Sequence, residues 1–328
     1  MKAPSFWYKN PPNIIAKILF PLSCLTSCIT QYRVSKTKPK VEVPVICCGN
    51  LTVGGTGKTI LALEIGSFYK NQGIHIAFLT RGYKKKKKQP IPFKVNSNIH
   101  TFNDVGDEAL LLSQIGDTWI GSNRFDSAQK AIQHGAELLI MDDGFQNPTL
   151  YQDLPILILD GTRGFGNQLC LPAGPCREKL CHGVLRAKVC ICIDKDEQQI
   201  LPLLPSSLPV FHAALEMDEK IKHFKHQSVI AFAGIGRPKK FFQALRANGL
   251  TLAHSLSFPD HYNYRNKDFK KLLTLKRRLD LPLVTTPKDY VKLPEILKSK
   301  ITALDVHLRW DDDRALTKIN TLLQNEGS

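Results

Sequence analysis

A glycine-dense segment that ends in lysine and threonine is the part of this chain most directly suited to chemistry. It consists of Thr52, Val53, Gly54, Gly55, Thr56, Gly57, Lys58 and Thr59. A short apolar run over 44–50, typical of a buried strand, precedes it, and apolar residues at helical spacing follow from Ile60. Strand, glycine loop and helix in this order indicate a phosphate-binding loop. Its backbone N–H groups would surround phosphate oxygens, Lys58 would reach the β- and γ-oxygens, and the Thr59 hydroxyl would bind Mg²⁺.

The loop departs from the usual pattern at one position. A glycine is expected five places before Gly57, and this chain has Thr52 there. An ordinary glycine turn followed by an exposed lysine is the alternative, but the flanking strand and helix favour a variant phosphate loop. We therefore predict that residues 52–59 bind a nucleoside triphosphate.

Acidic residues follow other predicted elements. An apolar strand over 136–141 leads into Asp142 and Asp143, and a carboxylate in that position downstream of a phosphate loop typically holds Mg²⁺ directly or through water. Asp107 and Glu108 open a predicted helix over 109–113. They are either favourable charges at a helix N-terminus or a hydroxyl-activating base beside a metal, so Glu108 is a further metal candidate.

Two more candidates lie on loops. Arg177 and Glu178 end a glycine- and proline-rich loop that begins at residue 171. An arginine held in such a loop suits the stabilisation of charge on a transferring phosphoryl group, and a surface ion pair between these two residues is the alternative. His261 follows a predicted strand, in a segment facing the first lobe. For an isolated loop histidine, capping of local structure would be the simpler interpretation, but its place in Phe258-Pro-Asp-His-Tyr262 at the end of that strand favours a functional role.

The charge of the chain is strongly positive. It has 45 Lys and Arg against 29 Asp and Glu, a net charge of +16 over 328 residues, and residues 1–41 contain no acid. Such basicity favours phosphates, nucleic acid or an anionic membrane. The nine cysteines include no CxxC pair, which indicates free thiols in a reducing cytoplasm; Cys176, Cys181 and His182 lack the spacing of a zinc site.

An apolar segment over 13–33 lies within this basic region. Its uncharged part, 18–32, has 15 residues, fewer than the ~20 that a spanning helix needs. We therefore expect a helix in the bilayer interface, with Trp7 and Tyr8 at headgroup level. A buried amphipathic helix packed on its own domain is the alternative.

The alternation of strands and helices predicts an α/β protein with two lobes. We expect the N-terminal membrane-associated helix region over 1–40, a P-loop domain with three α/β/α layers over 41–208, and a second, smaller α/β lobe over 209–328 that includes linker strands and a C-terminal helix. The proline-rich stretch 201–209 would be the linker, and 301–308 one strand. Lys84 to Lys88 are expected to form a solvated loop.

Taken together and in this order, the motifs resemble the tetraacyldisaccharide 4′-kinase family of lipid A biosynthesis. The resemblance covers nearly the whole chain and is carried by 49–59, 80–83, 105–108, 142–146, 164–167, 171–178, 232–238 and 258–261. It implies a kinase on the cytoplasmic face of the inner membrane. That kinase would use ATP and Mg²⁺ to phosphorylate the 4′-hydroxyl of a lipid A disaccharide precursor, a tetraacyl glucosamine disaccharide 1-phosphate. Its expected partners are this lipid and the anionic membrane surface, not nucleic acid.

The resemblance also implies roles for individual residues. Lys58 and Thr59 would hold the triphosphate and Mg²⁺, and Asp142 and Asp143 would serve the metal. Asp107 would be the base for the sugar hydroxyl. The remaining implied roles are His261 as the support of that base from the second lobe, Arg177 and Glu178 at the phosphates and metal, and Arg81 and Tyr83 at the lipid headgroup.

Two other functions fit parts of the sequence. A membrane-cycling P-loop ATPase that recruits partners would also use a glycine pair and a basic amphipathic helix, but it would not require Asp107 and His261 together. A nucleic-acid-stimulated NTPase is motivated by charge alone, and strong salt-dependent stimulation by nucleic acid would support it.

Overall fold

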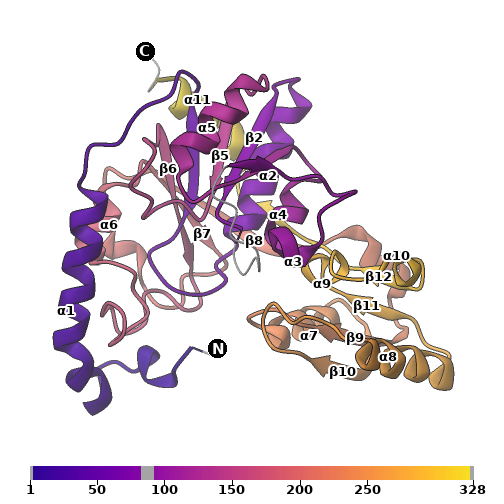
Figure 1. The fold of residues 1–328 in the computed structure, drawn as a ribbon. Coiled ribbons are helices and arrows are strands. Elements are labelled where there is room, and N and C mark those ends of the chain that lie inside the picture. Colours follow the sequence, from indigo (N-terminus) through magenta and orange to yellow (C-terminus); the bar gives the residue numbers. More distant parts are fainter. Residues whose placement is uncertain (1–2, 83–91, 326–328) are drawn as a thin grey trace.

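A nine-stranded sheet forms the centre of the molecule (Figure 1). The computed structural model describes residues 3–82 and 92–325. The strand order is β13-β8-β7-β6-β1-β5-β2-β4-β3, and every neighbouring pair is parallel except β3 with β4 and β13 with β8. The strands are β1 (Val45–Gly49), β2 (Ile76–Thr80), β3 (Phe93–Lys94), β4 (Asp117–Ile120), β5 (Leu138–Asp142), β6 (Leu154–Asp160), β7 (Val189–Ile193), β8 (Val210–Met217) and β13 (Val306–Trp310).

Helices cover both faces of this sheet. Ile46 and Cys48 of β1 belong to an apolar core with α2 (Lys58–Asn71) and α11 (Ala315–Asn325). Val45 and Cys47, which alternate with them, belong to the core on the other face, with α5 (Arg124–Gln133) and α6 (Leu180–Leu185). Burial on both faces explains the continuous apolar run of β1. The two cores confirm the predicted three-layer architecture.

A second sheet builds the smaller lobe, which lies at the lower right in Figure 1. Its strand order is β10-β9-β11-β12, with all pairs parallel. The strands are β9 (Ser228–Ala233), β10 (Thr251–Ser257), β11 (Leu283–Thr285) and β12 (Ile301–Ala303). Its helices are α7 (Pro238–Ala247), α8 (Asn266–Leu279), α9 (Pro287–Tyr290) and α10 (Glu295–Lys298). The short helices α3 (Phe102–Val105) and α4 (Asp107–Leu112) of the large lobe lie beside α9.

The boundary between the lobes differs from the sequence prediction. Strands β8 and β13 and helix α11, which were expected in the smaller lobe, belong to the large sheet and its core. The proline-rich stretch therefore connects β7 to β8 within one lobe, and the chain returns from the small sheet between β12 and β13. The expected single strand over 301–308 is thus split between two sheets. An apolar alternating pattern identifies a strand but not the sheet that it joins.

Helix α1 (Ile14–Val34) lies along one side of the large lobe (Figure 1). Its 21 residues continue through Pro21 and span about 32 Å. In the described part of the chain it is the one helix long and apolar enough to cross a membrane, and only 17% of its most apolar stretch is buried. A helix of the protein's own core would be mostly buried, so α1 is not a core helix, although one of its faces packs on the large lobe. The uncharged stretch over 18–32 is shorter than a spanning helix needs, but α1 as a whole has 21 residues, so its length fits either a spanning or an interfacial helix.

Candidate active site

The glycine loop joins the central strand β1 to the N-terminus of α2. Gly57 precedes the helix with φ of 89°, a left-handed conformation that glycine adopts without strain. The Asn50 side chain donates to Thr56 Oγ1 at 3.0 Å, and Lys58 Nζ reaches back to the Gly54 carbonyl at 3.5 Å. The loop and the helix N-terminus therefore form the phosphate-binding arrangement that the sequence predicts.

Asp142 lies beside this loop because β5 pairs with β1. Thr59 Oγ1 donates to Asp142 Oδ2 at 3.1 Å. Asp142 is 2% exposed, and its Oδ1 atom has no hydrogen-bond partner among the described residues. Burial, and then the charges of Glu108 and Asp143, raise the pKa of Asp142 to about 7. A buried carboxylate in this condition is suited to a cation that neutralises it.

Arg177 pairs with Asp143 rather than with its neighbour Glu178. Its guanidinium donates to both Asp143 oxygens, at 2.7 and 3.1 Å, and Lys58 Nζ lies 3.8 Å from the same carboxylate. Burial opposes ionisation of Asp143, but the two cations hold the pKa of its carboxyl below the usual value. Lys58 and Arg177 thus converge on one point at the carboxyl edge of the sheet, and the surface ion pair considered for Arg177 is not formed.

Glu178 is placed behind Arg177. It is 2% exposed and accepts two hydrogen bonds from Arg186, at 2.6 and 2.8 Å, and one from the Gln146 amide at 2.8 Å. The Gln146 carbonyl oxygen in turn accepts from Arg177 at 3.4 Å. Glu178 therefore supports the loop over 170–178 that carries Arg177, which we call the arginine loop.

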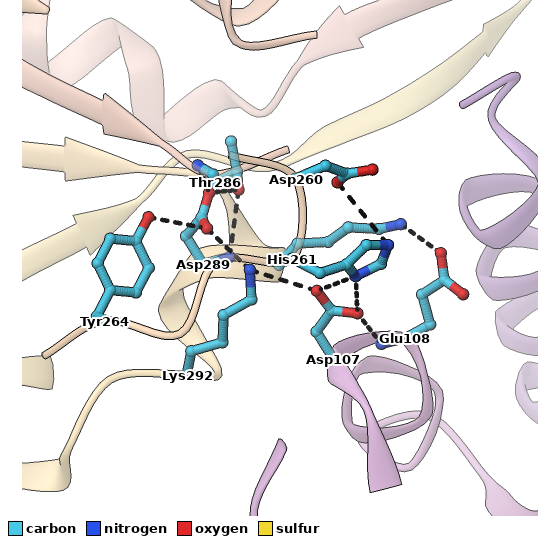
Figure 2. A network of polar contacts seen from close by, with 10 residues as sticks. Asp107, Glu108, Asp260, His261, Tyr264, Thr286, Asp289 and Lys292 are labelled. Carbon is cyan, nitrogen blue, oxygen red and sulfur yellow. Dashed lines mark hydrogen bonds and ion pairs between the residues drawn. The ribbon is translucent and has the colours of Figure 1, made fainter. Parts of the chain in front are cut away.

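Asp107 and His261 meet across the boundary between the lobes (Figure 2). His261 Nδ1 lies 3.0 and 2.9 Å from the two Asp107 oxygens, and the Glu108 N–H donates to Asp107 Oδ1 at 3.0 Å. Asp107 is 5% exposed. Burial opposes its ionisation, but the hydrogen bond with His261 and the charge of Lys292 hold the pKa of the carboxyl well below its usual range.

Two lysines of the small lobe reach the same helix terminus. Lys288 Nζ lies 2.7 Å from Glu108 Oε1, and Lys292 Nζ lies 3.3 Å from Asp107 Oδ2. The charges of Glu108 and Lys288 also act on Asp142, which places this cluster within electrostatic reach of the phosphate loop. The structure thus engages Glu108, our further metal candidate, in an ion pair between the lobes.

Sequence reasoning missed these lysines and two supporting residues, Arg186 and Gln146. The available signal for the lysines was a Lys-Asp pair at 288–289, separated by two residues from the end of β11, followed by Lys292 one helical turn after Lys288. Of the two residues expected at the lipid headgroup, Arg81 lies exposed just after β2. Tyr83 lies outside the described residues, as does the run from Lys84 to Lys88.

No group of three or more His, Cys, Asp or Glu side chains in the described residues is arranged to hold a metal alone. At a nucleotide, Mg²⁺ is typically held by one or two carboxylates together with the phosphates. Asp142 and Thr59 fit that role, because Asp142 presents a buried oxygen without a hydrogen bond next to the Thr59 hydroxyl.

Known proteins resemble this chain over almost its full length. The family model described as LpxK, tetraacyldisaccharide-1-P 4′-kinase, matches residues 15–324. A tetraacyldisaccharide 4′-kinase of Gluconobacter oxydans is 41% identical over 322 residues, covering 98% of both chains. One of Gluconacetobacter diazotrophicus is 43% identical over 315 residues, covering 96% of both.

A solved structure shows the same fold. It is LpxK from Aquifex aeolicus in complex with ATP, which is 27% identical and superimposes with a TM-score of 0.76, covering 94% of this chain and 99% of the other. With the family model matching most of the chain and relatives of about 40% identity along its whole length, the chain belongs to the tetraacyldisaccharide-1-P 4′-kinase family.

Proposed function

We propose that this kinase transfers the γ-phosphate of ATP to the 4′-hydroxyl of a tetraacyl glucosamine disaccharide 1-phosphate through two groups of residues. The phosphate half of the site consists of the glycine loop with Lys58, Asp142, Asp143 and Arg177. The hydroxyl half consists of Asp107 and His261. The observation that carries the proposal is the Asp107–His261 pair, because ATP hydrolysis by a partner-recruiting ATPase would need the phosphate half alone.

The phosphate half supplies positioning and charge neutralisation, which are the main requirements of phosphoryl transfer. The loop amides and the N-terminus of α2 bind phosphate oxygens, and Lys58 and Arg177 bring two cations to one point. The Asp143 carboxylate pairs with both cations and keeps them in place before ATP binds. Because Gln146 and Glu178 fix the arginine loop from behind, Arg177 is oriented before the triphosphate arrives.

Asp142 and Thr59 would hold the Mg²⁺ ion. Bound there, the ion would neutralise charge on the phosphate oxygens. The pKa of Asp142, which burial raises to about 7, supports this role, since the carboxylate gains a counter-charge when a cation is present.

The hydroxyl half would take the proton of the acceptor. As the new bond forms between the sugar oxygen and the γ-phosphorus, the bond from that phosphorus to the ADP oxygen breaks, and the hydroxyl proton passes to the Asp107–His261 pair. The pair is completed only where the small lobe meets the large one. Assembly across two lobes favours a site that is complete when the lobes are closed and water is excluded.

The acceptor is a lipid, and a position on the cytoplasmic face of the inner membrane is part of the proposal; the features of α1 support association with a membrane. An exposed apolar stripe at helical spacing runs along it, consisting of Ile14, Ile18, Leu22, Leu25, Ile29 and Tyr32. Basic residues in the surrounding segment would contact anionic headgroups. Arg81 and Tyr83 would contact the headgroup of the substrate.

The opposite face of α1 docks on the arginine loop. Ser23 Oγ donates to the Cys170 carbonyl at 2.8 Å, and Thr26 donates to that of Leu171. Trp7 was expected at headgroup level, but it is 9% exposed and its indole N–H donates to the Pro172 carbonyl at 3.0 Å. These contacts connect the proposed membrane helix to the loop that ends in Arg177 and Glu178.

Transfer of radiolabelled phosphate from ATP to the detergent-solubilised tetraacyl disaccharide 1-phosphate tests the proposal. The wild type should yield labelled lipid, and Lys58→Ala and Asp107→Ala should each lose most of this activity. Release of inorganic phosphate without labelled lipid would instead favour the partner-recruiting ATPase.

A further inference from the structure

Lys292 is a buried lysine between two carboxylates. Its side chain is 1% exposed, with Nζ 3.0 Å from Asp289 Oδ1 and 3.3 Å from Asp107 Oδ2. Burial of an ammonium group is costly unless geometry and pairing compensate for the lost hydration. Here the compensation comes from both lobes, since Asp289 belongs to the small lobe and Asp107 to the large one.

Asp289 is a fixed point within the small lobe. It is completely buried and accepts hydrogen bonds from the Gly234 N–H at 2.9 Å, the Tyr264 hydroxyl at 3.0 Å and the Thr286 hydroxyl at 2.8 Å. Thr286 also caps α9, on which Asp289 lies. With three donors from three segments, this carboxylate holds one end of Lys292 in a defined place.

Gly234 also fixes His261. The His261 N–H donates to the Gly234 carbonyl at 3.0 Å, while the Gly234 N–H donates to Asp289. There is little room at this residue, because a Cβ atom on Gly234 would lie 3.0 Å from Asp289 Oδ1 and 3.1 Å from the Tyr264 hydroxyl. His261 itself has φ of 54°, a conformation uncommon for residues other than glycine and frequent at functional sites.

The two small-lobe partners of Asp107 are therefore both anchored at Gly234. His261 is anchored through the Gly234 carbonyl, and Lys292 through Asp289, which accepts from the Gly234 N–H. His261 approaches the carboxylate from one side and Lys292 from another, as Figure 2 shows. A carboxylate held by one partner can rotate about its side-chain bonds. Contacts to both partners define its position relative to the small lobe.

We propose that Lys292 is a positioning residue for phosphoryl transfer, which fixes the Asp107 carboxylate against His261 where the two lobes meet. This inference rests on the proposed role of Asp107. Lys292 acts through Asp107, because its side chain is 1% exposed and its ammonium group contacts Asp107 and Asp289. A purely structural lysine, serving only to neutralise Asp289, would support the fold without contributing to the rate through Asp107.

A double-mutant cycle distinguishes the two roles. Kinetics of labelled lipid formation would be measured for the wild type, Lys292→Met, Asp107→Ala and the double variant. A displacement of about 1 Å at a reacting group costs on the order of 10²-fold in rate, so Lys292→Met should lower kcat by roughly 10- to 100-fold with the KM for ATP unchanged. In the Asp107→Ala background the same substitution should change kcat by less than about twofold.

Lys298→Met is the matched control. Lys298 pairs with Glu295 at 2.5 Å in the same lobe, by the same i, i+3 spacing as Lys292 and Asp289, but its partner Glu295 is exposed and no contact with Asp107 is formed. It should leave kcat unchanged. Melting temperatures of all variants would be measured beside the kinetics. If Lys292→Met does not fold, Asp289→Asn replaces it in the cycle, because it keeps the lysine and weakens its anchor.

The outcomes separate this inference from the proposed function. If Asp107→Ala keeps full activity, the assignment of the hydroxyl half is wrong. If Asp107→Ala loses activity but Lys292→Met does not, only the role of Lys292 is overturned. An equal fall in kcat with and without Asp107 would also overturn it and would leave Lys292 a structural residue.

Discussion

Lys58, Asp142 and Arg177 all belong to the large lobe, whereas Asp107 meets His261 across the boundary between lobes. The phosphate half is built on neighbouring strands of one sheet and on loops braced against each other. For example, the Val53 N–H donates to the Pro175 carbonyl at 2.9 Å. The hydroxyl half has Asp107 at the start of α4 and His261 on a loop of the small lobe.

Because of this difference, the cations that bind ATP and the pair that accepts the hydroxyl proton lie in different parts of the molecule. Movement of the small lobe leaves the contacts among Lys58, Asp143 and Arg177 intact, but it separates Asp107 from His261. The cations that meet ATP therefore lie together in the large lobe, although Arg237 of the small lobe also donates to the Gly55 carbonyl of the glycine loop at 3.1 Å. The acceptor hydroxyl meets a complete proton-accepting pair only where the lobes are closed. Variants in the two halves should have different kinetic signatures.

The largest effect is expected in the phosphate half. Lys58→Ala removes a cation that is 11% exposed, lies 3.8 Å from Asp143 and reaches the glycine loop. Loss of a preorganised charge of this kind costs about 10²- to 10³-fold in kcat, and we expect at least the upper value together with weaker ATP binding. Titration with a fluorescent ATP analogue beside the lipid assay checks both. Unchanged nucleotide affinity and rate would contradict the assignment of the loop.

A smaller effect, on kcat and not on ATP affinity, is expected in the hydroxyl half. General acid–base catalysis typically contributes about 10²- to 10⁴-fold, so His261→Ala should lower kcat by roughly 10²-fold while ATP affinity is retained. His254→Ala is a suitable control, because His254 lies exposed on β10 in the same lobe. A loss of ATP affinity in His261→Ala would mean that the two halves are not separable.

The two halves also differ in how far the sequence predicts them. Lys58 and Thr59 are read from a local motif, since strand, loop and helix follow one another along the chain. Asp142 follows because the carboxyl ends of β1 and β5 meet at one edge of a parallel sheet. The pairing of Asp107 with His261, which are 154 positions apart, came from family resemblance rather than from spacing.

Lys292 and the lobe boundary could not be predicted in the same way. The burial of Lys292 depends on how α4 docks against α9, which no periodicity of the sequence encodes. Val306–Trp310 has the pattern of a strand, but its pairing with β8 instead of β12 is decided by the tertiary packing of α11 on the large sheet. The elements were predictable from local sequence, while their assignment to lobes was not.

Weakening the Lys288–Glu108 contact between lobes should affect mainly the hydroxyl half. Lys288 and Glu108 form an ion pair between lobes, with side chains 32% and 28% exposed. Partly exposed pairs are worth up to about 1 kcal/mol, so Lys288→Met should raise the KM for the lipid acceptor by about threefold to fivefold. Its ATP affinity should change less than the KM for the lipid, because Lys288 reaches Asp142 only through its charge. Isothermal titration with ATP and the lipid assay measure these quantities, and a change confined to ATP would reverse the interpretation.

The smallest effect on activity in detergent is expected far from both halves, on the exposed stripe of α1. Ile18 is 70% exposed on α1, and Ile296 is 75% exposed on α10 of the small lobe. An apolar side chain buried in lipid is worth about 1.5–3 kcal/mol, so Ile18→Asp should weaken binding to anionic vesicles by at least about tenfold in a sedimentation assay. Ile296→Asp should bind vesicles like the wild type.

Both variants should phosphorylate detergent-solubilised acceptor at nearly the wild-type rate, because surface substitutions usually change stability by less than about 0.5 kcal/mol. If Ile18→Asp and Ile296→Asp bind vesicles equally well, the stripe on α1 is not the membrane-binding surface. If Ile18→Asp instead lowers kcat in detergent, the contacts from Ser23 and Thr26 to the arginine loop transmit the state of α1 to the phosphate half. The phosphate half would then depend on α1 as well as on its own strands and loops.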